Sequence, residues 1–396
     1  MQDILQKHFG FKKFLPLQKE IVSDVLKNKD TLAILPTGGG KSLCYQLPAV
    51  MLPGITLVIS PLIALMKDQV GSLKDNNIKA AYLNSSLGVR EERAVKEEIQ
   101  DGGMKLLYIA PERMLKPEFI DFISALKVSL IAIDEAHCIS EWGHDFRPEY
   151  RNISALRKLF PSVPIIALTA SATARVRQDI VRQLEFKNYS LHSASFDRKN
   201  LRYYVRPKHE TYTQILNYIE DHPDDSGIIY CHSRAGVNNI VASLISDGVE
   251  ALPYHAGLPT KERTENQDQF MKGKVKVMAA TIAFGMGIDK SDIRFVIHHD
   301  LPKNLEGYYQ ETGRAGRDNE PADCILFFSY ADKMKHEFFI KKSQNPLHMR
   351  IARDQLQQII NFCTYTQCRR KMLLQYFGEE YLEDNCAACD FCADFV

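Results

Sequence analysis

The stretch Ile34-Leu35-Pro36-Thr37-Gly38-Gly39-Gly40-Lys41-Ser42 joins an apolar run at residues 31–35 to a helix-compatible segment at residues 43–47. Glycines allow backbone N–H groups to turn inward around a polyphosphate, and the N-terminus of the following helix attracts negative charge. The order of strand, glycine loop and helix therefore predicts a phosphate-binding loop.

Each part of this loop has an expected role. The backbone of residues 37–40 would surround the phosphates of a nucleotide, Lys41 would reach the β- and γ-phosphates, and Ser42 would hold Mg²⁺. The strict form of the motif is incomplete, because Leu35 stands where its first glycine is expected. A plain loop before a helix is the alternative interpretation.

Composition limits the class of protein. A chain of 396 residues with 45% hydrophobic and 25% charged residues is typical of a soluble protein of two or three domains. It contains neither an apolar run long enough to span a membrane nor an apolar signal-peptide core at its N-terminus. The formal net charge of +1 means that any nucleic-acid surface must be a local groove.

Short β-rich runs alternate with helical patterns, first along residues 31–168 and again along residues 227–298. This alternation predicts an α/β fold of two lobes, each with a parallel sheet flanked by helices. Ligands of such sheets bind at the carboxyl ends of the strands. The strands are expected at residues 31–35, 55–60, 79–83, 105–109, 130–133 and 164–168, then at 227–231, 251–255, 275–280 and 294–298.

The run Ile131-Ala132-Ile133-Asp134-Glu135-Ala136-His137 delivers two adjacent carboxylates to the end of an expected strand. Asp134 can hold Mg²⁺ through water, and Glu135 can orient or deprotonate the water that attacks the γ-phosphate. We count His137 with this catalytic group. A solvated turn is the alternative, and the phosphate loop some ninety residues earlier makes it the weaker one.

Two further features are candidates for contact with a single-stranded nucleic acid. Ser60 and Pro61 follow one strand, and residues 110–113 follow another, at positions where helix N-termini could hold successive phosphates, although such prolines are also ordinary turn chemistry. The segment 138–150 interleaves aromatic and basic side chains, on which bases could stack, unless they cap the core. Its candidate contacts are Trp142, His144, Phe146 and Arg147.

Near the end of the second alternating region, Gln310, Arg314 and Arg317 recur at helical spacing. All three could therefore face one partner. Two arginines directed into a cleft would stabilise charge on a transferring phosphoryl group. A surface helix held by salt bridges is the alternative.

The tail beyond residue 331 loses the strand pattern and becomes helical and charged. Four cysteines, Cys368, Cys386, Cys389 and Cys392, could surround one tetrahedral Zn²⁺ with no open position for water. An iron–sulfur cluster is the rival, although the expected fourth cysteine followed by proline is missing.

Such a structural zinc would fold a segment too small to build its own core. It would also present basic side chains to the phosphates of a nucleic acid. The residues expected to do so are Arg369, Arg370 and Lys371.

Taken together, these motifs resemble the RecQ family of superfamily 2 DNA helicases over essentially the whole chain. The resemblance rests on residues 35–46, 60–70, the acidic box with its aromatic loop, Ala280–Gly287, residues 308–318 and the cysteine set. It implies two RecA-like lobes with ATP between them, at residues 1–198 and 199–330, and a zinc module at 331–396.

The resemblance also implies site roles. Gln18, which could otherwise be a solvated residue of an amphipathic helix, would recognise adenine, with Phe11 and Phe14 grouped in the same nucleotide site. Arg314 and Arg317 would reach the nucleotide from the second lobe. Leu15 and Ser171 depart from the family pattern, which usually has arginine and threonine there. Leu15 cannot stack a guanidinium on adenine.

The expected function is that of an ATP-dependent 3′→5′ DNA helicase of recombination, repair and replication. The expected ligands are ATP, Mg²⁺ and Zn²⁺, and the expected partners are single-stranded and partly duplex DNA and repair or single-strand-binding proteins. The chain is expected to be a monomer that lacks the family's winged-helix and accessory domains, either as a natural short form or as part of a longer protein. It would lie in the cytoplasm of a bacterium or archaeon, at the nucleoid, or in a eukaryotic nucleus. The alternative is a zinc-stabilised scaffold that binds or anneals DNA strands with a weak or vestigial ATPase.

Overall fold

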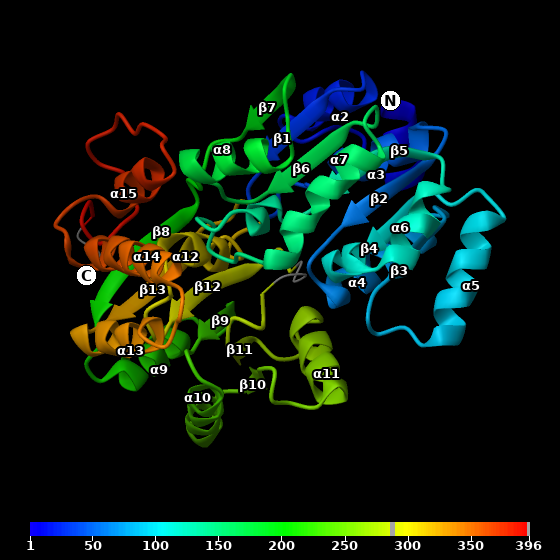
Figure 1. The fold of residues 1–396 in the computed structure, drawn as a ribbon. Helices are drawn as coiled ribbons and strands as arrows, with labels where there is room; N and C mark the ends of the chain where they lie inside the picture. The colour runs from blue at the N-terminus through cyan, green and yellow to red at the C-terminus, as the bar shows by residue number, and fades with distance from the viewer. Residues whose placement is uncertain (286–289, 394–396) are drawn as a thin grey trace. The chain divides into compact units, whose positions relative to one another are not determined.

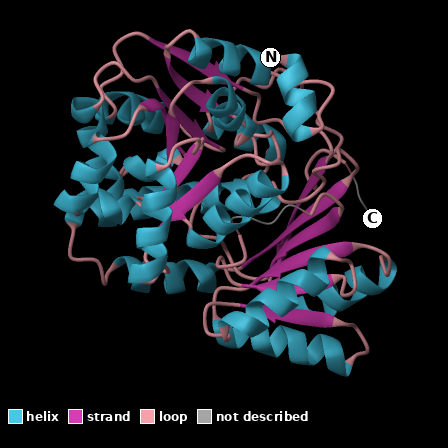
Figure 2. Ribbon diagram, turned by 90° about the vertical axis from the view of Figure 1, so that its right-hand side faces the viewer, coloured by secondary structure: helices cyan, strands magenta, loops and turns pink. Residues whose placement is uncertain are grey.

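The computed structural model describes residues 1–285 and 290–393. It contains two compact units, Met1–Ser195 and Phe196–Val396. Each unit is built on one parallel sheet with helices on both faces, as Figures 1 and 2 show. The predicted fold class is therefore confirmed. Among the described residues, no helix has the length and apolarity needed to cross a membrane.

The first unit holds a seven-stranded sheet in the order β3-β4-β2-β5-β6-β1-β7. Its strands are β1 (Asp30–Ile34), β2 (Ile55–Ile59), β3 (Ala80–Leu83), β4 (Leu106–Ile109), β5 (Val128–Ile133), β6 (Ile165–Thr169) and β7 (Tyr189–Ser193). Its α-helices are α1 (Gln2–Phe9), α2 (Gln18–Leu26), α3 (Leu43–Met51), α4 (Ile63–Asp75), α5 (Val89–Gln100), α6 (Pro117–Ser124), α7 (Ser154–Leu159) and α8 (Ala174–Gln183). Short 3₁₀ turns lie at η1 (Pro111–Leu115), η2 (Ala136–Ile139) and η3 (Pro148–Ile153).

The second unit holds a six-stranded sheet in the order β10-β11-β9-β12-β13-β8. Its strands are β8 (Leu201–Pro207), β9 (Ser226–Tyr230), β10 (Ala251–Tyr254), β11 (Val277–Ala280), β12 (Ile293–His298) and β13 (Ala322–Phe328). Its helices are α9 (Thr211–Asp221), α10 (Arg234–Ser246), α11 (Thr260–Met271), α12 (Leu305–Thr312), α13 (Tyr330–Ile340), α14 (Pro346–Thr364) and α15 (Arg369–Tyr376). The ten predicted strands are present, and β7, β8 and β13 are additional.

Burial on both faces explains why the inner strands are nearly all apolar. In β5, Leu130 and Ala132 pack with α2, α3 and α4, and the alternate residues Ile131 and Ile133 are equally buried on the other face. Alternation of polar and apolar residues is lost when a parallel sheet is covered twice. The short continuous apolar runs of the sequence therefore mark the central strands.

The topology brings the sequence motifs to one edge of the first sheet. The phosphate loop follows β1, Asp134 follows β5, and only β6 lies between these two strands. Because all these strands are parallel, their carboxyl ends lie at the same edge. Ser60, at the end of β2, is beside the end of β5.

The helical tail belongs to the second unit. Backbone hydrogen bonds join its cysteine segment to β8, since the Tyr203 N–H donates to the Ala388 carbonyl at 3.0 Å and the Asp390 N–H donates to the Tyr203 carbonyl at 3.0 Å. The tail thus continues the edge of the sheet. The expected boundaries at residues 198 and 330 stay a prediction.

Candidate functional site

The phosphate loop is a tight turn whose glycines are required by close approach. Gly38 and Gly40 have φ angles of 82° and 67°, and a Cβ on Gly40 would collide with the side-chain amide of Gln18. The ammonium of Lys41 lies 3.3 Å from the Leu35 carbonyl and 3.4 Å from the Pro36 carbonyl. Backbone oxygens of the turn therefore hold the cation at the loop.

Gln18 links the N-terminal segment to this loop. Its side chain is 2% exposed, accepts the Leu15 N–H at 2.9 Å and donates to the Gly40 carbonyl at 3.1 Å. The alternative of a solvated glutamine is therefore wrong. Phe14 packs beside the small cluster formed by α1, α2 and α3, whereas Phe11 is 56% exposed. The nucleotide-binding roles of all three stay a prediction.

Asp134 is held rigidly at the end of β5. Its N–H donates to the Ile59 carbonyl at 2.9 Å, and its own carbonyl accepts the Tyr150 hydroxyl at 3.1 Å. Burial raises the pKa of the Asp134 carboxyl, the neighbouring Glu135 charge raises it further, and Lys41 lowers it. Two adjacent carboxylates close to the Lys41 ammonium, at the same sheet edge as the Ser42 hydroxyl, fit Mg²⁺, a hard cation that prefers oxygen ligands.

The backbone turns sharply at Glu135, which adopts a left-handed conformation with φ 46° and ψ 49°. Its Oε2 lies 3.3 Å from His137 Nδ1, and that nitrogen is 2.9 Å from the Thr169 hydroxyl. Burial lowers the pKa of His137 to about 4, so the ring is neutral at pH 7 and makes no ion pair with Glu135. Among the described residues Glu135 Oε2 is buried without a hydrogen-bond partner, which leaves it able to accept a proton or a water.

His137 connects the acids to two other segments. The Thr169 hydroxyl that it contacts lies at the end of β6 and donates to the Ser171 carbonyl at 3.0 Å. On its other side, the ring stacks on His144 with centroids 4.1 Å apart. The acidic box, the end of β6 and the aromatic loop are therefore joined through one buried imidazole.

The aromatic loop is further tied to the strand ends. Arg147 donates to the Pro61 carbonyl at 3.1 Å and to Asp145 Oδ2 at 2.9 and 3.1 Å, so the loop is fixed beside Ser60-Pro61. The guanidinium of Arg175, at the start of α8, lies over the Trp142 ring with its carbon 2.9 Å from the centroid. Trp142 and Phe146 are half-buried. Contact of the loop residues Trp142, His144, Phe146 and Arg147 with DNA stays a prediction.

In the second unit, Gln310, Arg314 and Arg317 do not share one helix. Helix α12 ends at Thr312 with Gly313 as its cap, and the two arginines follow in turns. Arg314 is buried and donates to the Gly285 carbonyl, and the Arg317 N–H donates to the Ser291 carbonyl at 3.1 Å. The prediction of a single helical face is corrected because Gly313 ends the helix. Of the segment Ala280–Gly287, residues 286 and 287 lie outside the described residues.

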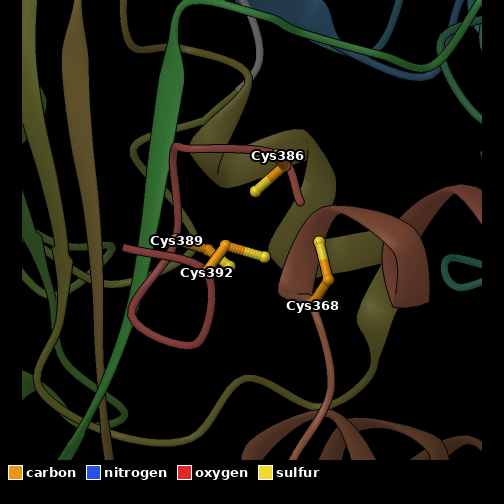
Figure 3. Close-up of side chains that lie close together, drawn as sticks. All are labelled: Cys368, Cys386, Cys389 and Cys392. Carbon is orange, nitrogen blue, oxygen red and sulfur yellow. The ribbon is translucent and has the colours of Figure 1, made fainter. Parts of the chain in front are cut away.

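The four cysteines of the tail gather into one cluster. Figure 3 shows Cys368 at the start of α15 and the other three on the loop that follows, with their sulfurs directed inward. Every pair of these sulfurs lies within 4.8 Å. A tetrahedral zinc with Zn–S bonds of about 2.3 Å requires sulfurs about 3.8 Å apart, so the residues fit this ion. The four lone cysteines and Cys363 are buried, as expected of small core residues.

Two arginines beside the cluster have a different role from the predicted one. Arg369 pairs with Asp390 at 2.9 Å and donates to the Phe362 carbonyl. Arg370, 4% exposed, pairs with Asp197 and donates to the Leu201 carbonyl at 2.8 Å. This corrects the prediction that both contact DNA, because both guanidiniums are already bound to carboxylates and carbonyls of the second unit. They fasten the tail to the sheet, and Lys371 is half-buried.

Family models match three consecutive parts of the chain. A DEAD/DEAH box helicase model matches residues 15–180, a helicase conserved C-terminal domain matches 208–319, and a RecQ zinc-binding model matches 330–393. The ATP-dependent DNA helicase RecQ of Bacillus subtilis is 43% identical over 99% of this chain and 67% of its own length. The chain belongs to the RecQ family of ATP-dependent DNA helicases. Its cysteine cluster is the zinc-binding site of that family.

Other RecQ proteins extend the likeness. The ATP-dependent DNA helicase RecQ of Pasteurella multocida is 48% identical over 99% of this chain, which spans 62% of that relative's length. The chain thus covers about three fifths of the length of its first relatives. Among solved structures, the Mycobacterium smegmatis helicase Lhr bound to single-stranded DNA and AMP-PNP has a TM-score of 0.65 at 20% identity, over 86% of this chain and 49% of that one. S. cerevisiae Dbp5 bound to RNA and ADP BeF3 has a TM-score of 0.66 at 16% identity, over 90% and 97%. These two likenesses show the fold alone.

Several contributors to the site had no signal in the sequence. Arg175 covers Trp142 from a helix that begins more than thirty residues later, and Asp197 holds Arg370 across 173 positions. Asp390 lies between two cysteines of the cluster, at a position that the spacing pattern leaves unspecified. Its carboxylate accepts hydrogen bonds from the Arg369 guanidinium and from the Val205 N–H. Partners this distant are specified by the fold rather than by local spacing.

Replacement of Arg370 by alanine should destabilise the second unit by about 3–5 kcal/mol, because the Leu201 carbonyl and the Asp197 carboxylate would lose a buried charged donor. The free energy of unfolding, measured in urea, checks this. Lys371→Ala is the matched control and should be nearly neutral, since its side chain is half-exposed. Unchanged stability together with weaker DNA binding in Arg370→Ala would restore the original interpretation.

The metal can be tested directly. Purified protein should be colourless and contain one zinc per chain, and Cys386→Ser should lose zinc and destabilise the tail, because three thiolates cannot complete the tetrahedral site. Elemental analysis measures the stoichiometry. Cys363→Ser, which removes a buried thiol outside the cluster, should keep its zinc. Iron with visible absorbance would contradict the assignment.

Proposed function

We propose that this chain is a DNA-dependent ATPase that moves 3′→5′ along single-stranded DNA and separates strands. The observation that carries the proposal is the buried Glu135 carboxylate with an uncommitted oxygen, at the same sheet edge as the Lys41 loop. Membership of the RecQ family supports DNA as the substrate.

In this proposal, the phosphate loop and Gln18 bind ATP. On binding, the Lys41 ammonium would leave its two backbone carbonyls and contact the β- and γ-phosphate oxygens. The Gln18 side-chain amide would leave the Gly40 carbonyl and hydrogen-bond to adenine. Mg²⁺, held by Ser42 and Asp134, would neutralise charge on the phosphates. Gln18 is already buried and oriented, so little side-chain entropy would be lost on binding.

Glu135 would then receive the proton of the attacking water. The new bond joins the water oxygen to the γ-phosphorus, the bond to the β,γ-bridging oxygen breaks, and ADP and phosphate leave. Neutral His137, whose Nδ1 lies 2.9 Å from the Thr169 hydroxyl and 3.3 Å from Oε2, would pack beside the carboxylate and leave Oε2 able to accept the proton. Gln310, Arg314 and Arg317 of the second unit are proposed to complete the catalytic group by stabilising the charge that develops on the phosphoryl oxygens.

Coupling to DNA would pass through the imidazole stack. A base that stacks on Trp142 or Phe146 would displace Arg175 or shift the loop, and His144 rests directly on His137. The same loop is fixed to the Ser60-Pro61 end of β2 by Arg147, where DNA phosphates are proposed to bind. Binding of DNA to the loop would thus change the position of Glu135 through His144 and His137 alone.

The wider setting follows from the same proposal. DNA is the proposed substrate, in single-stranded and partly duplex form, with repair and single-strand-binding proteins as partners of a monomer. A role in recombination and repair would place it at the nucleoid or in the nucleus.

Glu135→Gln should bind ATP with near-parent affinity but hydrolyse it about 10²–10³ times more slowly, the usual loss when one group acting on the transition state is removed. Turnover with and without single-stranded DNA, alongside nucleotide binding, measures both effects. Glu149→Gln, a half-exposed glutamate on η3, serves as control and should turn over normally. Normal hydrolysis in Glu135→Gln refutes the assignment, and a parent without any turnover favours the scaffold alternative.

Trp142→Ala should keep basal ATP turnover and lose most of its stimulation by single-stranded DNA, with binding weakened by about 1–3 kcal/mol for one stacked base. Arg175→Ala should retain stimulation, because it uncovers the ring rather than removing it. Dose–response curves of turnover against oligonucleotide concentration separate the two. If Trp142→Ala is stimulated like the parent, the loop serves only to cap the core.

A further inference from the structure

Helix α13 exposes a row of large apolar side chains. Tyr330, Met334 and Phe338 recur every four residues along one face and are 67%, 68% and 58% exposed, and the adjacent Phe339 is 53% exposed. The buried side of the helix carries Asp332, which pairs with Lys208, and His336, which contacts the Leu301 carbonyl, and α14 lies alongside (Figure 1). Helical packing of the tail therefore does not use this row, and an uncovered aromatic patch of this kind marks a site of interaction.

The patch is interleaved with lysines. The Lys342 ammonium lies 4.3 Å from the ring centroid of Phe338 and 5.6 Å from that of Phe339. Lys341 and Lys303 are also exposed, and none of these three lysines makes an ion pair with a carboxylate of the residues that the structure describes. Glu337, on the same helix, is 3.7 Å from Arg353, and the buried Asp332 is held by Lys208 at 3.1 Å.

The patch continues to the ligand-binding edge of the second sheet. The Phe339 ring is 5.5 Å from the ring of His232, which in turn is 5.4 Å from His336. His232 comes just after β9, and its N–H donates to Asp300 Oδ2 at 3.0 Å. Ligands of parallel sheets bind at this carboxyl edge, so α13 extends that edge with aromatic and basic side chains.

The chemistry of the patch favours one occupant. Protein-docking surfaces are depleted of lysine, whereas single-stranded nucleic acid is held by aromatic rings that stack with bases and by ammonium groups that meet phosphates. The nearby group of Cys231, His299 and Asp300 does not explain the patch as a metal site, because Lys208 already neutralises Asp300 at 2.6 Å.

We propose that the exposed face of α13 is a binding site for single-stranded DNA, with bases on Phe338 and Phe339 and phosphates on Lys341 and Lys342. The inference rests on the proposed function and adds a contact from the zinc module, in place of the buried Arg369 and Arg370. The bound DNA would then run past the carboxyl edge of the second sheet and onto α13.

Photocross-linking tests the placement. The full chain is irradiated with a single-stranded thymidine oligomer that carries one 5-iodouridine, and the adducts are mapped by mass spectrometry. Adducts on the peptide that contains Phe338 and Phe339 are expected. Adducts confined to the first unit would overturn this inference and leave the proposed function intact, and the absence of any DNA binding would refute both.

Substitutions test the chemistry. Phe338→Ala should weaken binding of the oligomer at least about fivefold, the change that corresponds to about 1 kcal/mol of stacking. Phe338→Leu keeps an apolar side chain without a ring face and should be equally weak. Tyr365→Ala, which removes an aromatic that is 50% exposed on the same module, is the control and should bind normally.

Lys342→Gln should lower the slope of log affinity against log salt by about 1. Parent affinity in Phe338→Leu alongside weak binding in Phe338→Ala would point to simple apolar docking and overturn the proposal. Loss of self-association in Phe338→Ala, seen by sedimentation, with DNA binding unchanged, would identify a second copy of the chain as the occupant instead.

Discussion

Burial of two adjacent carboxylates at the end of β5 is the constraint on which the first unit depends. Asp134 is 8% exposed, and desolvation raises the pKa of its carboxyl even though Lys41 is close enough to oppose that shift. Charge of this kind is expensive to bury without compensation. Three features suit such a site to a metal-bound polyphosphate. They are the loop that holds the Lys41 ammonium, the Ser42 hydroxyl at the start of α3 and the neutral His137.

The second unit solves a different problem, which is how to fix a long tail that carries little core of its own. Its cysteine loop contributes hydrogen bonds to the edge of β8, and Arg369 and Arg370 occupy carbonyls and carboxylates that would otherwise be buried alone. A zinc ion adds a covalent-like constraint where apolar burial is insufficient. Helix α14 packs against both α13 and α15, and the aromatic row on α13 stays exposed.

Sequence was sufficient for features that depend on local pattern and insufficient for those that depend on distant partners. The phosphate loop, the acidic box, the central strands and the cysteine cluster have short, periodic or closely spaced signatures. The edge strand β7 has alternating, partly exposed residues, and β8 mixes arginines with apolar residues, so neither carries the apolar run of a central strand. β13 does carry such a run, Cys324-Ile325-Leu326-Phe327, yet no strand was predicted there.

The positively charged residues of the tail show why residue type and spacing do not determine role. Arg369 and Arg370 follow a ligand cysteine, a position that suggested contact with DNA, but planar guanidiniums with several donors suit buried carbonyls and carboxylates. Lys341 and Lys342, which follow α13, have compact, strongly hydrated charges on flexible stems, which are costly to bury and remain at the surface. Basic residues that sit alongside exposed rings are therefore better candidates for phosphate contact than basic residues beside a metal site, and a net charge of +1 over the chain is compatible with both.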